Sequence, residues 1–526
     1  MPLSARHPPI TYPQHLLALP LAFTAALAAM TLLSPVVRNT HLLWSFWGAT
    51  ASLIAWNGLL LAGALRRGWT LRVEVVLRKQ HYLQACAQAS VLLYWGWYWR
   101  EVYHSAHLVA AQLLFAYAFD MLLSWSRRDT YTLGFAPFPV IFSINLFLWF
   151  KADWFYLQFL MIVVGFAAKE LIRWEKDGRR THVFNPSSLP LGIFSFGLLL
   201  TGTTDITWGH EVANTLNHAP HIYLMIFLIG LPGQFLFGVT TMTMSAAVTM
   251  YAFGLFYFAL TGTYFFFDSY IPIAVFLGMH LLFTDPSTSP RTELGRIIFG
   301  VVYALSAIAL YDLLSGLGAP TFYDKLLAVP IMNLAIKAID WVARSNALKR
   351  FDPASLARNL AGRRRHLAYI GVWTTVFIVM SAAQGVGDSH RGHWVPFWQR
   401  ACDEGRPNAC RNLALLVSTH CSAGSGWACN EYGILIQPVI RPESAARAFK
   451  RACDLGFAAG CANLDPGRAD APLRTLPSLT DYPIVLREGK GPLPSVPPLE
   501  LYQRACTQGF GDGCEQACRL GDLKAC

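Results

Sequence analysis

A dense group of charged and polar side chains lies between two apolar runs near the middle of the chain. After the apolar run 155–168 come Lys169, Glu170, Arg173, Lys176, Arg179, Arg180, His182, Asn185, Pro186 and Ser187. Proline disfavours the helical conformation in the residue before it and is well placed at a helix start, so the Asn-Pro step predicts a sharp turn between two helices. The first amides of the second helix could hold an anion or a polar ligand atom. The alternative is a turn capped by Asn185 and Ser187 that binds nothing.

A second polar interruption, residues 285–290, also follows an apolar run. Asp285 and Ser287 are suited to cap the next helix. Irregular backbone at membrane depth must either be buried in protein or line a cavity, so the same segment also predicts the wall of a flavin or quinone site. Both interpretations stay open, because a cap can form part of a site wall.

Isolated polar residues give weaker indications of function. Asp120 is a carboxylate within an apolar run, and such groups are functional candidates by default, although it could simply lie near an interface above Arg127. For His280, a hydrogen-bonded core position is the simpler interpretation. The loop after residue 203 carries side chains that are either solvated or the best candidate metal ligands in this half of the chain: His210, Glu211, His218 and His221.

The elements that must position these residues are membrane helices. Hydrophobic residues make up 54% of the chain and charged residues only 14%. We expect an all-α, polytopic membrane bundle of thirteen spans. The predicted spans are 16–35, 41–64, 82–99, 106–125, 131–150, 154–172, 189–203, 221–240, 245–265, 270–283, 296–315, 323–342 and 367–384.

The basic residues give the expected orientation. The formal charge of +11 does not indicate nucleic acid, because the basic residues cluster in alternate loops between spans. Cytoplasmic loops are enriched in Lys and Arg, so we expect the N-terminus in the bacterial cytoplasm and everything after the thirteenth span on the periplasmic side of the inner membrane.

Ten of the eleven cysteines lie after residue 400, in five copies of the pattern C-x2-G-x4-C. Repetition of this kind predicts a solenoid of helix pairs. We expect each glycine to take the left-handed position that ends a helix, and each cysteine pair to bridge the turn as a disulfide, which requires an oxidising compartment. The pairs are Cys402–Cys410, Cys421–Cys429, Cys453–Cys461, Cys506–Cys514 and Cys518–Cys526. No C-x-x-C spacing indicates a metal site among them.

These repeats resemble the cysteine-rich Sel-one-like repeats, relatives of the tetratricopeptide repeat. The resemblance implies docking of a periplasmic protein partner. The proline-rich stretch 464–500 is expected to be an insertion or linker within the repeat part, 395–526.

Residues 70–343 resemble the family that contains the D-type subunit of the Rnf electron-transport complex and the B-type subunit of the sodium-translocating NADH:quinone reductase. The stretches that carry the resemblance are 77–80 (LRKQ), 169–174 (KELIRW) with 184–187 (FNPS), 227–238 (FLIGLPGQFLFG), 284–292 (TDPSTSPRT) with Gly295-Arg296 and Phe299-Gly300, and 329–333 (VPIMN) with Ile339-Asp340. The resemblance implies a core of ten helices, spans three to twelve, in two inverted sets of five.

The resemblance also implies flavin mononucleotide (FMN) as a cofactor. In that family a threonine in an outer loop carries the flavin through phosphate; the nearest counterpart here is Thr215, but the small residues that precede the family's threonine are absent. The cofactor-binding residues implied are Lys169, Arg173, Phe184, Asn185, Pro186, Ser187, Thr215, Asp285, Thr288, Ser289 and Arg296. No residue is assigned to catalysis or to a metal.

The expected organisation is therefore an additional N-terminal hairpin (1–66), the electron-transport-like domain (70–343), a basic linker (344–366), a last span (367–384) and the repeats. The function expected is that of an integral subunit of a bacterial electron-transport complex, which works with other membrane redox subunits and is not a stand-alone enzyme. The alternatives are a transporter or channel, whose pore would be lined by Asp120, His280 or Asp285, and a membrane-anchored scaffold.

Overall fold

The computed structural model describes residues 19–67, 72–128, 130–176, 178–356, 362–438, 442–465, 472–486 and 496–526. Parts of the predicted N-terminal hairpin, basic linker and proline-rich insertion lie outside these ranges. The chain divides into two compact units. The first unit is Met1–Leu216, Met225–Thr249 and Ala274–Thr374, and the second is Asn217–Leu224, Met250–Ile273 and Thr375–Cys526.

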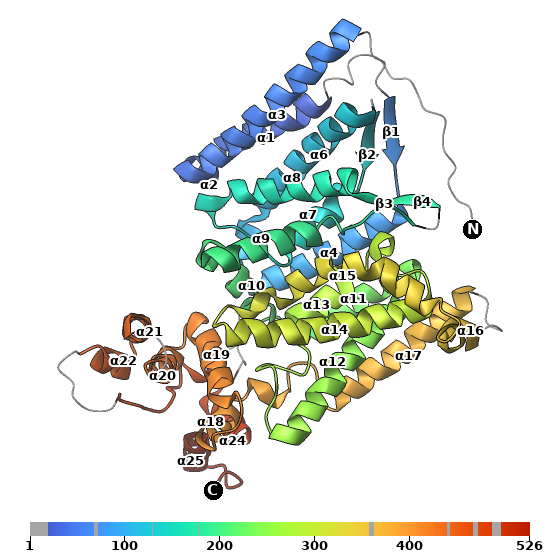
Figure 1. Ribbon diagram of the computed structural model, residues 1–526. Coiled ribbons are helices and arrows are strands. Elements are labelled where there is room, and N and C mark those ends of the chain that lie inside the picture. The colour runs from blue at the N-terminus through green and yellow to red at the C-terminus, as the bar shows by residue number, and fades with distance from the viewer. Residues whose placement is uncertain are drawn as a thin grey trace. The chain divides into compact units, whose positions relative to one another are not determined.

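Most of the described chain is helical, as the sequence predicts, and Figure 1 shows the elements in chain order. The helices that overlap the thirteen predicted spans are α1 (Leu19–Ala29), α3 (Thr40–Arg67), α4 (Lys79–Tyr98), α6 (Ala106–Arg128), α7 (Pro137–Asn145), α8 (Tyr156–Leu171), α9 (Ser188–Thr201), α11 (Ile222–Phe237), α12 (Thr240–Thr261), α13 (Ile273–Leu281), α14 (Glu293–Gly316), α15 (Asp324–Ala343) and α17 (Gly362–Ala382).

Five helical segments in the described ranges are long and apolar enough to cross a membrane: Thr40–Ala64, Ala106–Arg128, Thr240–Thr261, Glu293–Gly316 and Thr321–Ala343. Three further apolar helices are shorter: Leu19–Leu32, Ser188–Thr201 and Ile222–Phe237. These lengths and compositions are those of a polytopic membrane protein.

Two of the predicted spans in the core contain only a nine-residue helix. Helices α7 and α13 have nine residues each, which at 1.5 Å per residue is about 14 Å, or half the hydrocarbon core of a bilayer. Pro137 stands at the start of α7 and Pro272 directly before α13, and each favours a helix start at its position. The prediction of full spans at 131–150 and 270–283 is therefore wrong in length.

The expectation of an all-α membrane part is also corrected by two small sheets. Strands β1 (Arg72–Val76) and β2 (Thr130–Gly134) pair in parallel, with Glu74 opposite Thr132. Strands β3 (Arg173–Lys176) and β4 (Arg179–His182) form an antiparallel hairpin, in which Trp174 is opposite Thr181. Gly178, at φ +70°, takes the left-handed conformation in the hairpin turn, where a residue with a Cβ would be strained. The charge cluster is thus a hairpin between α8 and α9.

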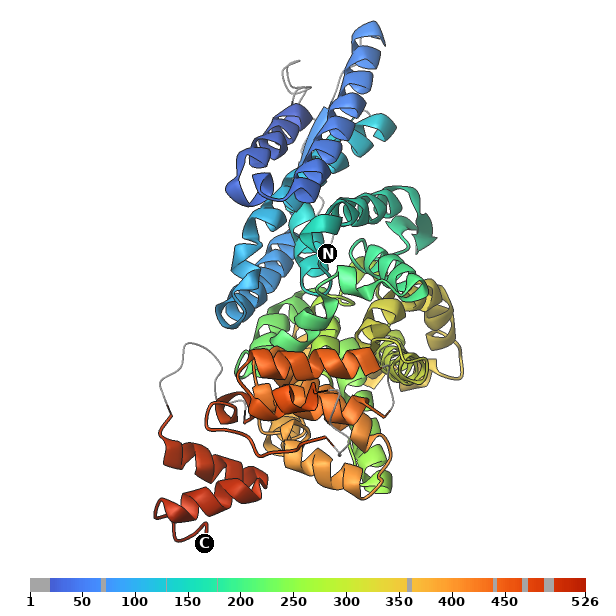
Figure 2. The ribbon, with the colours of Figure 1, turned by 90° about the vertical axis from the view of Figure 1, so that its left-hand side faces the viewer.

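The second unit contains the repeats, drawn in orange and red in Figure 2. Successive helices pack as pairs, α18 with α19, α19 with α20, α20 with α21, α21 with α22, and α24 with α25. Their bounds are α18 (Val395–Asp403), α19 (Ala409–Ser422), α20 (Gly426–Ile436), α21 (Pro442–Asp454), α22 (Ala458–Asn463), α24 (Pro498–Gln508) and α25 (Gly511–Arg519).

All five predicted disulfides are formed in the structure. The five repeat glycines have positive φ, as the pattern predicts: Gly405, Gly424, Gly456, Gly509 and Gly521. Each disulfide closes a loop of eight residues around such a glycine, so it fixes the angle between one helix and the chain that follows.

The core of the second unit also includes a segment from outside the predicted repeats. Tyr264, from the loop between α12 and α13, lies in the same buried cluster as Trp398 and Trp427. Within this cluster the Trp398 indole donates to the Phe267 carbonyl at 3.2 Å, and the Asn412 amide donates to the Tyr264 carbonyl at 3.2 Å. The sequence places this loop and the repeats on the same side of the membrane, and their shared core agrees with that placement.

The proline-rich stretch is not simply a linker. The short helix α23 (Tyr482–Val485) lies within it, and the side chains of Tyr482 and Val485 are buried in the core of the second unit. Aromatic burial of this kind stabilises the fold, so this portion belongs to the repeat domain.

The disulfide pattern gives a direct test by thiol labelling. The structure pairs ten of the eleven cysteines and leaves Cys86, on α4, as an exposed thiol. We therefore expect the unfolded, unreduced protein to take up one maleimide per chain, and eleven after reduction, as counted by intact mass. A Cys86→Ser variant should take up none before reduction. Several reactive thiols before reduction would contradict the pairing.

Candidate functional site

A cavity of about 380 Å³ opens in the first unit, at the end of the helices where the charge cluster lies. Its charged lining comes from stretches that are far apart in the sequence. The basic side chains are Arg78, Arg128, Lys169, Arg173 and Arg180, the acidic ones are Glu74, Asp120, Glu170 and Asp285, and the histidines are His81 and His182. The loops that carry most of these side chains are all assigned to one membrane side from charge alone.

Helix α6 contributes one continuous polar strip to the cavity. Asp120, Ser124 and Arg128 are spaced four residues apart and all line it, because such spacing places side chains on one face of a helix. From the sequence alone, Asp120 is either a functional carboxylate or a residue that lies near the membrane interface. The structure places its carboxylate in the wall of a charged cavity.

The end of α8 supplies the densest part of the charge. Glu170 lies between two arginines, at 2.7 Å from Arg128 and 2.6 Å from Arg173. Arg173 also donates through Nε to the carbonyl of Lys169 at 3.1 Å. Arginines held in this way lose less side-chain entropy when a further anion binds to their remaining N–H groups.

Three other cations of the lining have no carboxylate partner in the parts of the chain that the structure describes. These are Arg78, Lys169 and Arg180; the Lys169 ammonium lies 5.2 Å from the centre of the Phe166 ring. Cations that converge on a cavity without counter-charges favour an anionic ligand. The lining therefore offers charged donors that could hold an anion or a phosphate group, and four carboxylates line the same cavity.

The Asn185-Pro186 turn forms another part of the wall, and its polar atoms are already used. The Asn185 side-chain oxygen accepts bonds from the Ser187 amide at 2.9 Å, the Ser187 hydroxyl at 2.7 Å and the Ser188 amide at 3.2 Å. The amides of Ser187 and Ser188 at the start of α9 are thus capped by Asn185, as the alternative interpretation of the turn predicts, and they are not free to hold an anion.

Asn185 also joins two distant parts of the chain. Its side-chain nitrogen donates to the Leu282 carbonyl, just after α13, at 3.0 Å, and its backbone amide donates to the Asn333 side chain of α15 at 3.0 Å. The polar interruption after α8 is therefore fixed directly to the one after α13.

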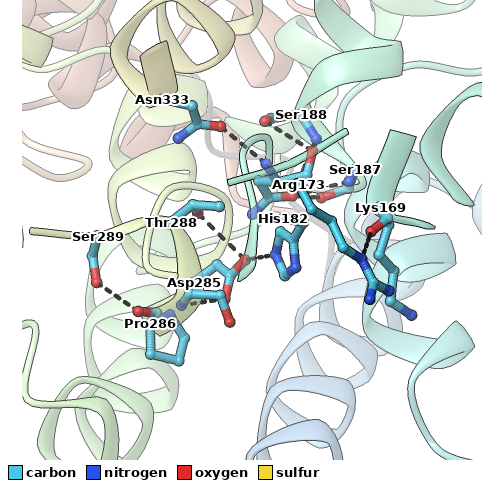
Figure 3. A network of polar contacts seen from close by, with 12 residues as sticks. Lys169, Arg173, His182, Ser187, Ser188, Asp285, Pro286, Thr288, Ser289 and Asn333 are labelled. Atoms are coloured by element: carbon cyan, nitrogen blue, oxygen red, sulfur yellow. Dashed lines mark hydrogen bonds and ion pairs between the residues drawn. The ribbon is translucent and has the colours of Figure 1, made fainter. Parts of the chain in front are cut away.

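The β3–β4 hairpin makes two further links to the segment after α13. His182 and Asp285 lie 3.1 Å apart, with the imidazole directed at the carboxylate in Figure 3. Lys176 is buried; its ammonium donates to the Ser289 carbonyl at 2.7 Å and lies 3.6 Å from Asp340. A buried lysine requires such partners, because its charge cannot be left unpaired in a medium of low polarity.

Asp285 is held in its charged form. Burial favours the neutral acid, but the bonds from His182, the Ser287 amide and the Thr288 hydroxyl outweigh it and hold the pKa of Asp285 below its usual value. Its stabilising contribution is therefore present above the ordinary aspartate pKa and is lost as the pH falls through the lower, folded-state value. Asp285 caps a short 3-10 helix, η5 (Pro286–Thr288), whereas α14 is capped by Thr292 and not by Asp285 or Ser287.

Six of the eleven cofactor-binding residues predicted from the sequence line this one cavity: Lys169, Arg173, Asn185, Pro186, Ser187 and Asp285. Phe184, Thr288, Ser289 and Arg296 do not line it. Arg296 bonds instead to Glu293 at 2.7 Å, and Thr288 and Ser289 bond within their own turn.

Thr215 lies far from the cavity. It is buried on α10 (Gly209–Leu216), where its hydroxyl donates to the Glu211 carbonyl at 2.7 Å and accepts from the Trp95 indole at 3.2 Å. Trp95 and the cavity residue His81 are fourteen residues apart on α4, or about 21 Å along the helix. A buried hydroxyl with two partners is not suited to carry a flavin phosphate.

The candidate metal ligands after residue 203 do not form a site. His210 bonds to the Asn214 side chain at 2.9 Å, and no group of three metal-binding side chains occurs among the described residues. The His280 imidazole donates through Nδ1 to the Phe276 carbonyl of its own helix at 2.8 Å and packs against Trp373, so it is a core histidine.

Several cavity residues are not among the site residues predicted from the sequence. Arg78 enters the sequence argument in the stretch 77–80 and Arg180 in the charge cluster, but neither is assigned to the site. Arg128 enters it only as a charge that sets orientation, and Glu74 and His81 do not enter it. The sequence does contain a signal that could have located Glu74. Charged and β-branched residues alternate at 72–76, which is typical of a strand, and in the parallel pair Glu74 is opposite Thr132.

Comparison with known proteins found no match: no family model, no curated protein and no solved structure matches the chain.

The Asn185 contacts can be tested by stability. We expect Asn185→Ala to lower the free energy of unfolding by about 3 kcal/mol or more, because it leaves the Leu282 carbonyl and the amides of Ser187 and Ser188 unpaired at a cost of about 1–3 kcal/mol each. The measurement is the thermal midpoint in detergent. The thermal midpoint of Asn185→Asp should lie between those of Asn185→Ala and the native chain, since the aspartate keeps the accepting oxygen and loses the donating nitrogen.

The matched control is Asn214→Ala, which removes only an exposed contact to His210 and should leave the midpoint close to that of the native chain. Equal midpoints for Asn185→Ala and the native chain would show that Asn185 does not hold the two interruptions together.

Proposed function

We propose that the chain is an integral membrane subunit of a bacterial electron-transport assembly, and that its charged cavity binds the anionic edge of a flavin or quinone-type cofactor. The observation that carries the proposal is the meeting of two polar interruptions about a hundred residues apart. Asn185 bonds to the carbonyl after α13, His182 pairs with Asp285, and both interruptions contribute to the wall of one cavity. Three of the stretches that resemble the electron-transport family contribute to that wall: 77–80, 169–174 with 184–187, and 284–292.

The short helices α7 and α13 support the same proposal. If the core consists of two inverted sets, α4, α6, α7, α8 and α9 followed by α11 to α15, these two are the third helix of each set. Short, interrupted helices at corresponding positions of two repeats are the usual indication of a binding site in such folds. The start of α7 and the segment after α13 both contribute to the cavity.

The lining fits one part of a flavin nucleotide better than the other. Arg78, Lys169 and Arg180 suit a phosphate group, because their charged N–H donors form no ion pair with a carboxylate among the described residues. No Phe, Tyr or Trp is among the described lining residues, so the cavity offers no aromatic face on which the flavin ring would stack. The cavity thus fits the phosphate or another acidic edge. Bound FMN would supply one- and two-electron chemistry, and these side chains would hold and orient it.

The expected topology belongs to this proposal. It comprises thirteen crossings, an N-terminus in the cytoplasm and repeats in the periplasm, where disulfides are stable. Five short-range disulfides and a loop between spans that shares the repeat core are consistent with this arrangement. The repeats would then hold a periplasmic protein against the membrane part, as repeats similar to Sel-one-like repeats imply.

Transport of a small organic anion is a second candidate. The observation in its favour is the lining itself, which is ionic and without aromatic rings, and inverted five-helix sets also build uptake proteins. This candidate requires no chromophore.

The two candidates separate on purification. For the electron-transport subunit we expect the detergent-purified protein to show flavin absorption and fluorescence, or to quench the fluorescence of added FMN with saturation. Lys169→Gln and Arg180→Gln should each weaken FMN binding by about tenfold or more, since each removes one charge-assisted contact of about 1.5–3 kcal/mol. Lys349→Gln, an exposed change on another loop, is the control.

A colourless protein that neither binds FMN nor retains riboflavin would overturn the first candidate. If the same protein, in liposomes, carried an organic anion with a dependence on Lys169 and Arg180, the second would take its place.

A further inference from the structure

An extended segment of the repeat domain, residues 472–477, is held by side chains of the repeat helices through its backbone. Asn463, at the end of α22, bonds to both sides of one peptide unit: its side-chain nitrogen donates to the Leu473 carbonyl at 3.0 Å, and its oxygen accepts from the Leu473 amide at 2.7 Å. Asn430 of α20 donates to the same carbonyl at 3.0 Å. Two asparagines therefore bond to the segment as a neighbouring strand would.

The next two residues extend the same row of contacts. The Trp427 indole donates to the Thr475 carbonyl at 2.8 Å, and Arg474 pairs with Glu431 at 3.5 Å between Nε and Oε2. Trp427, Asn430 and Glu431 all lie on α20 within five residues, so one helix provides most of the contacts. We call the surface formed by these residues and Asn463 the α20 groove.

The segment contributes little to the core of the domain. The side chains of residues 473–476 are all exposed, with Leu476 at 66%. The chain after Ser478 differs: Asp481 caps α20 by accepting from the Trp427 amide at 3.1 Å, and Tyr482 is buried in the core. A stretch held by its backbone, with its side chains in solvent, is bound as a ligand is bound and not as a core strand is packed.

The α20 groove also contains a preformed site for a cation. The Glu431 side chain is only 6% exposed, whereas its partner Arg474 is 56% exposed. Burial raises the pKa of Glu431, and the nearby Arg474 opposes this effect. The carboxylate is thus a fixed part of the groove that requires a positive partner, and the arginine is the replaceable member of the pair.

Space for a larger ligand remains beside the segment. A cavity of about 240 Å³ adjoins it, walled on the repeat side by Gln399, Trp427, Glu431 and Phe510. The Trp427 and Phe510 rings meet edge to face at 6.2 Å between centroids. Aromatic walls next to a buried carboxylate suit the aliphatic stem and charged head of a lysine or arginine.

We propose that the α20 groove is a peptide-binding site, that residues 472–477 occupy it in cis, and that the partner of the repeat domain presents an extended segment with a basic side chain that binds Glu431. The proposal rests on the proposed function in one respect, since it gives the chemistry of the protein partner named there. Because the asparagine and indole contacts reach only backbone atoms, they accept many sequences, and the Glu431 pair supplies the selection. The in-cis segment then limits access to partners that outcompete it.

The test uses the full-length protein in detergent and a fluorescein-labelled synthetic peptide, Pro-Leu-Arg-Thr-Leu-Pro, followed by fluorescence anisotropy. The groove is opened by the double variant Leu473→Pro with Arg474→Glu. Proline removes the amide that bonds to Asn463, and the new carboxylate repels Glu431. Residues from Ser478 onward are left unchanged, because they belong to the core.

We expect the opened variant to bind the peptide about tenfold or more tightly than the native chain, as removal of a competing in-cis ligand predicts. A peptide with glutamate in place of arginine should bind at least about tenfold more weakly, the equivalent of one lost charged contact. Adding Asn463→Ala to the opened variant should abolish binding, and Leu479→Ala, a change at an exposed site outside the groove, should behave as the native chain.

Failure of the peptide to bind the opened variant, in a sample that still shows five disulfides by thiol counting, would overturn the proposal. Equal binding of the arginine and glutamate peptides would also overturn the proposal, since Glu431 would then not discriminate between a basic and an acidic side chain. Neither result depends on a cofactor in the membrane part, so the outcome is separate from that of the FMN experiment.

Discussion

The membrane part of this protein depends on one constraint: polar backbone groups exposed where helices break must find partners away from water. The chain breaks after α8 and again after α13, and Asn185 resolves both breaks. Its oxygen satisfies the first amides of α9, and its nitrogen satisfies a carbonyl that α13 leaves unpaired. An unpaired group of this kind costs about 1–3 kcal/mol, so the two breaks are most stable when they lie together. The place where they meet is the wall of the charged cavity.

The charges around the cavity follow from this arrangement. Once the two breaks are joined, the β3–β4 hairpin of the first break contacts the segment after α13, where the buried Lys176 bonds to Ser289 and lies near Asp340. The remaining cations then face a shared space, and Glu170 balances only two of them. The surplus positive charge is what gives the site its preference for an anion, and it is supported by the same contacts that hold the helices.

Much of this could be predicted from the sequence, and the exceptions have physical causes. Apolar runs locate the helices because burial in lipid leaves few other structures, and the cysteine spacing predicts the disulfides because eight residues around a left-handed glycine close one geometry. The lengths of α7 and α13 are overestimated from the sequence. The residues that flank these helices are as apolar as those of a membrane span, although the helices do not continue through them. The hairpin at 173–182 is missed because its charges mask its alternation. Residues such as Thr288 and Arg296 are placed in the site by resemblance, whereas local bonds in fact turn them elsewhere.

The presence of Tyr264 inside the core of the repeat unit has a consequence for how the chain is made. That residue emerges from the ribosome more than a hundred residues before the first repeat cysteine, on a loop between two apolar helices. The disulfides join neighbours and can close as soon as each repeat appears, but the hydrophobic interior stays incomplete until the earlier loop has reached the same compartment. A misinserted α12 or α13 would therefore leave fully oxidised repeats with an unfilled core, a species that cellular quality control could recognise and remove. In the proposed topology, completion of the repeat core therefore requires correct threading of membrane helices synthesised long before it.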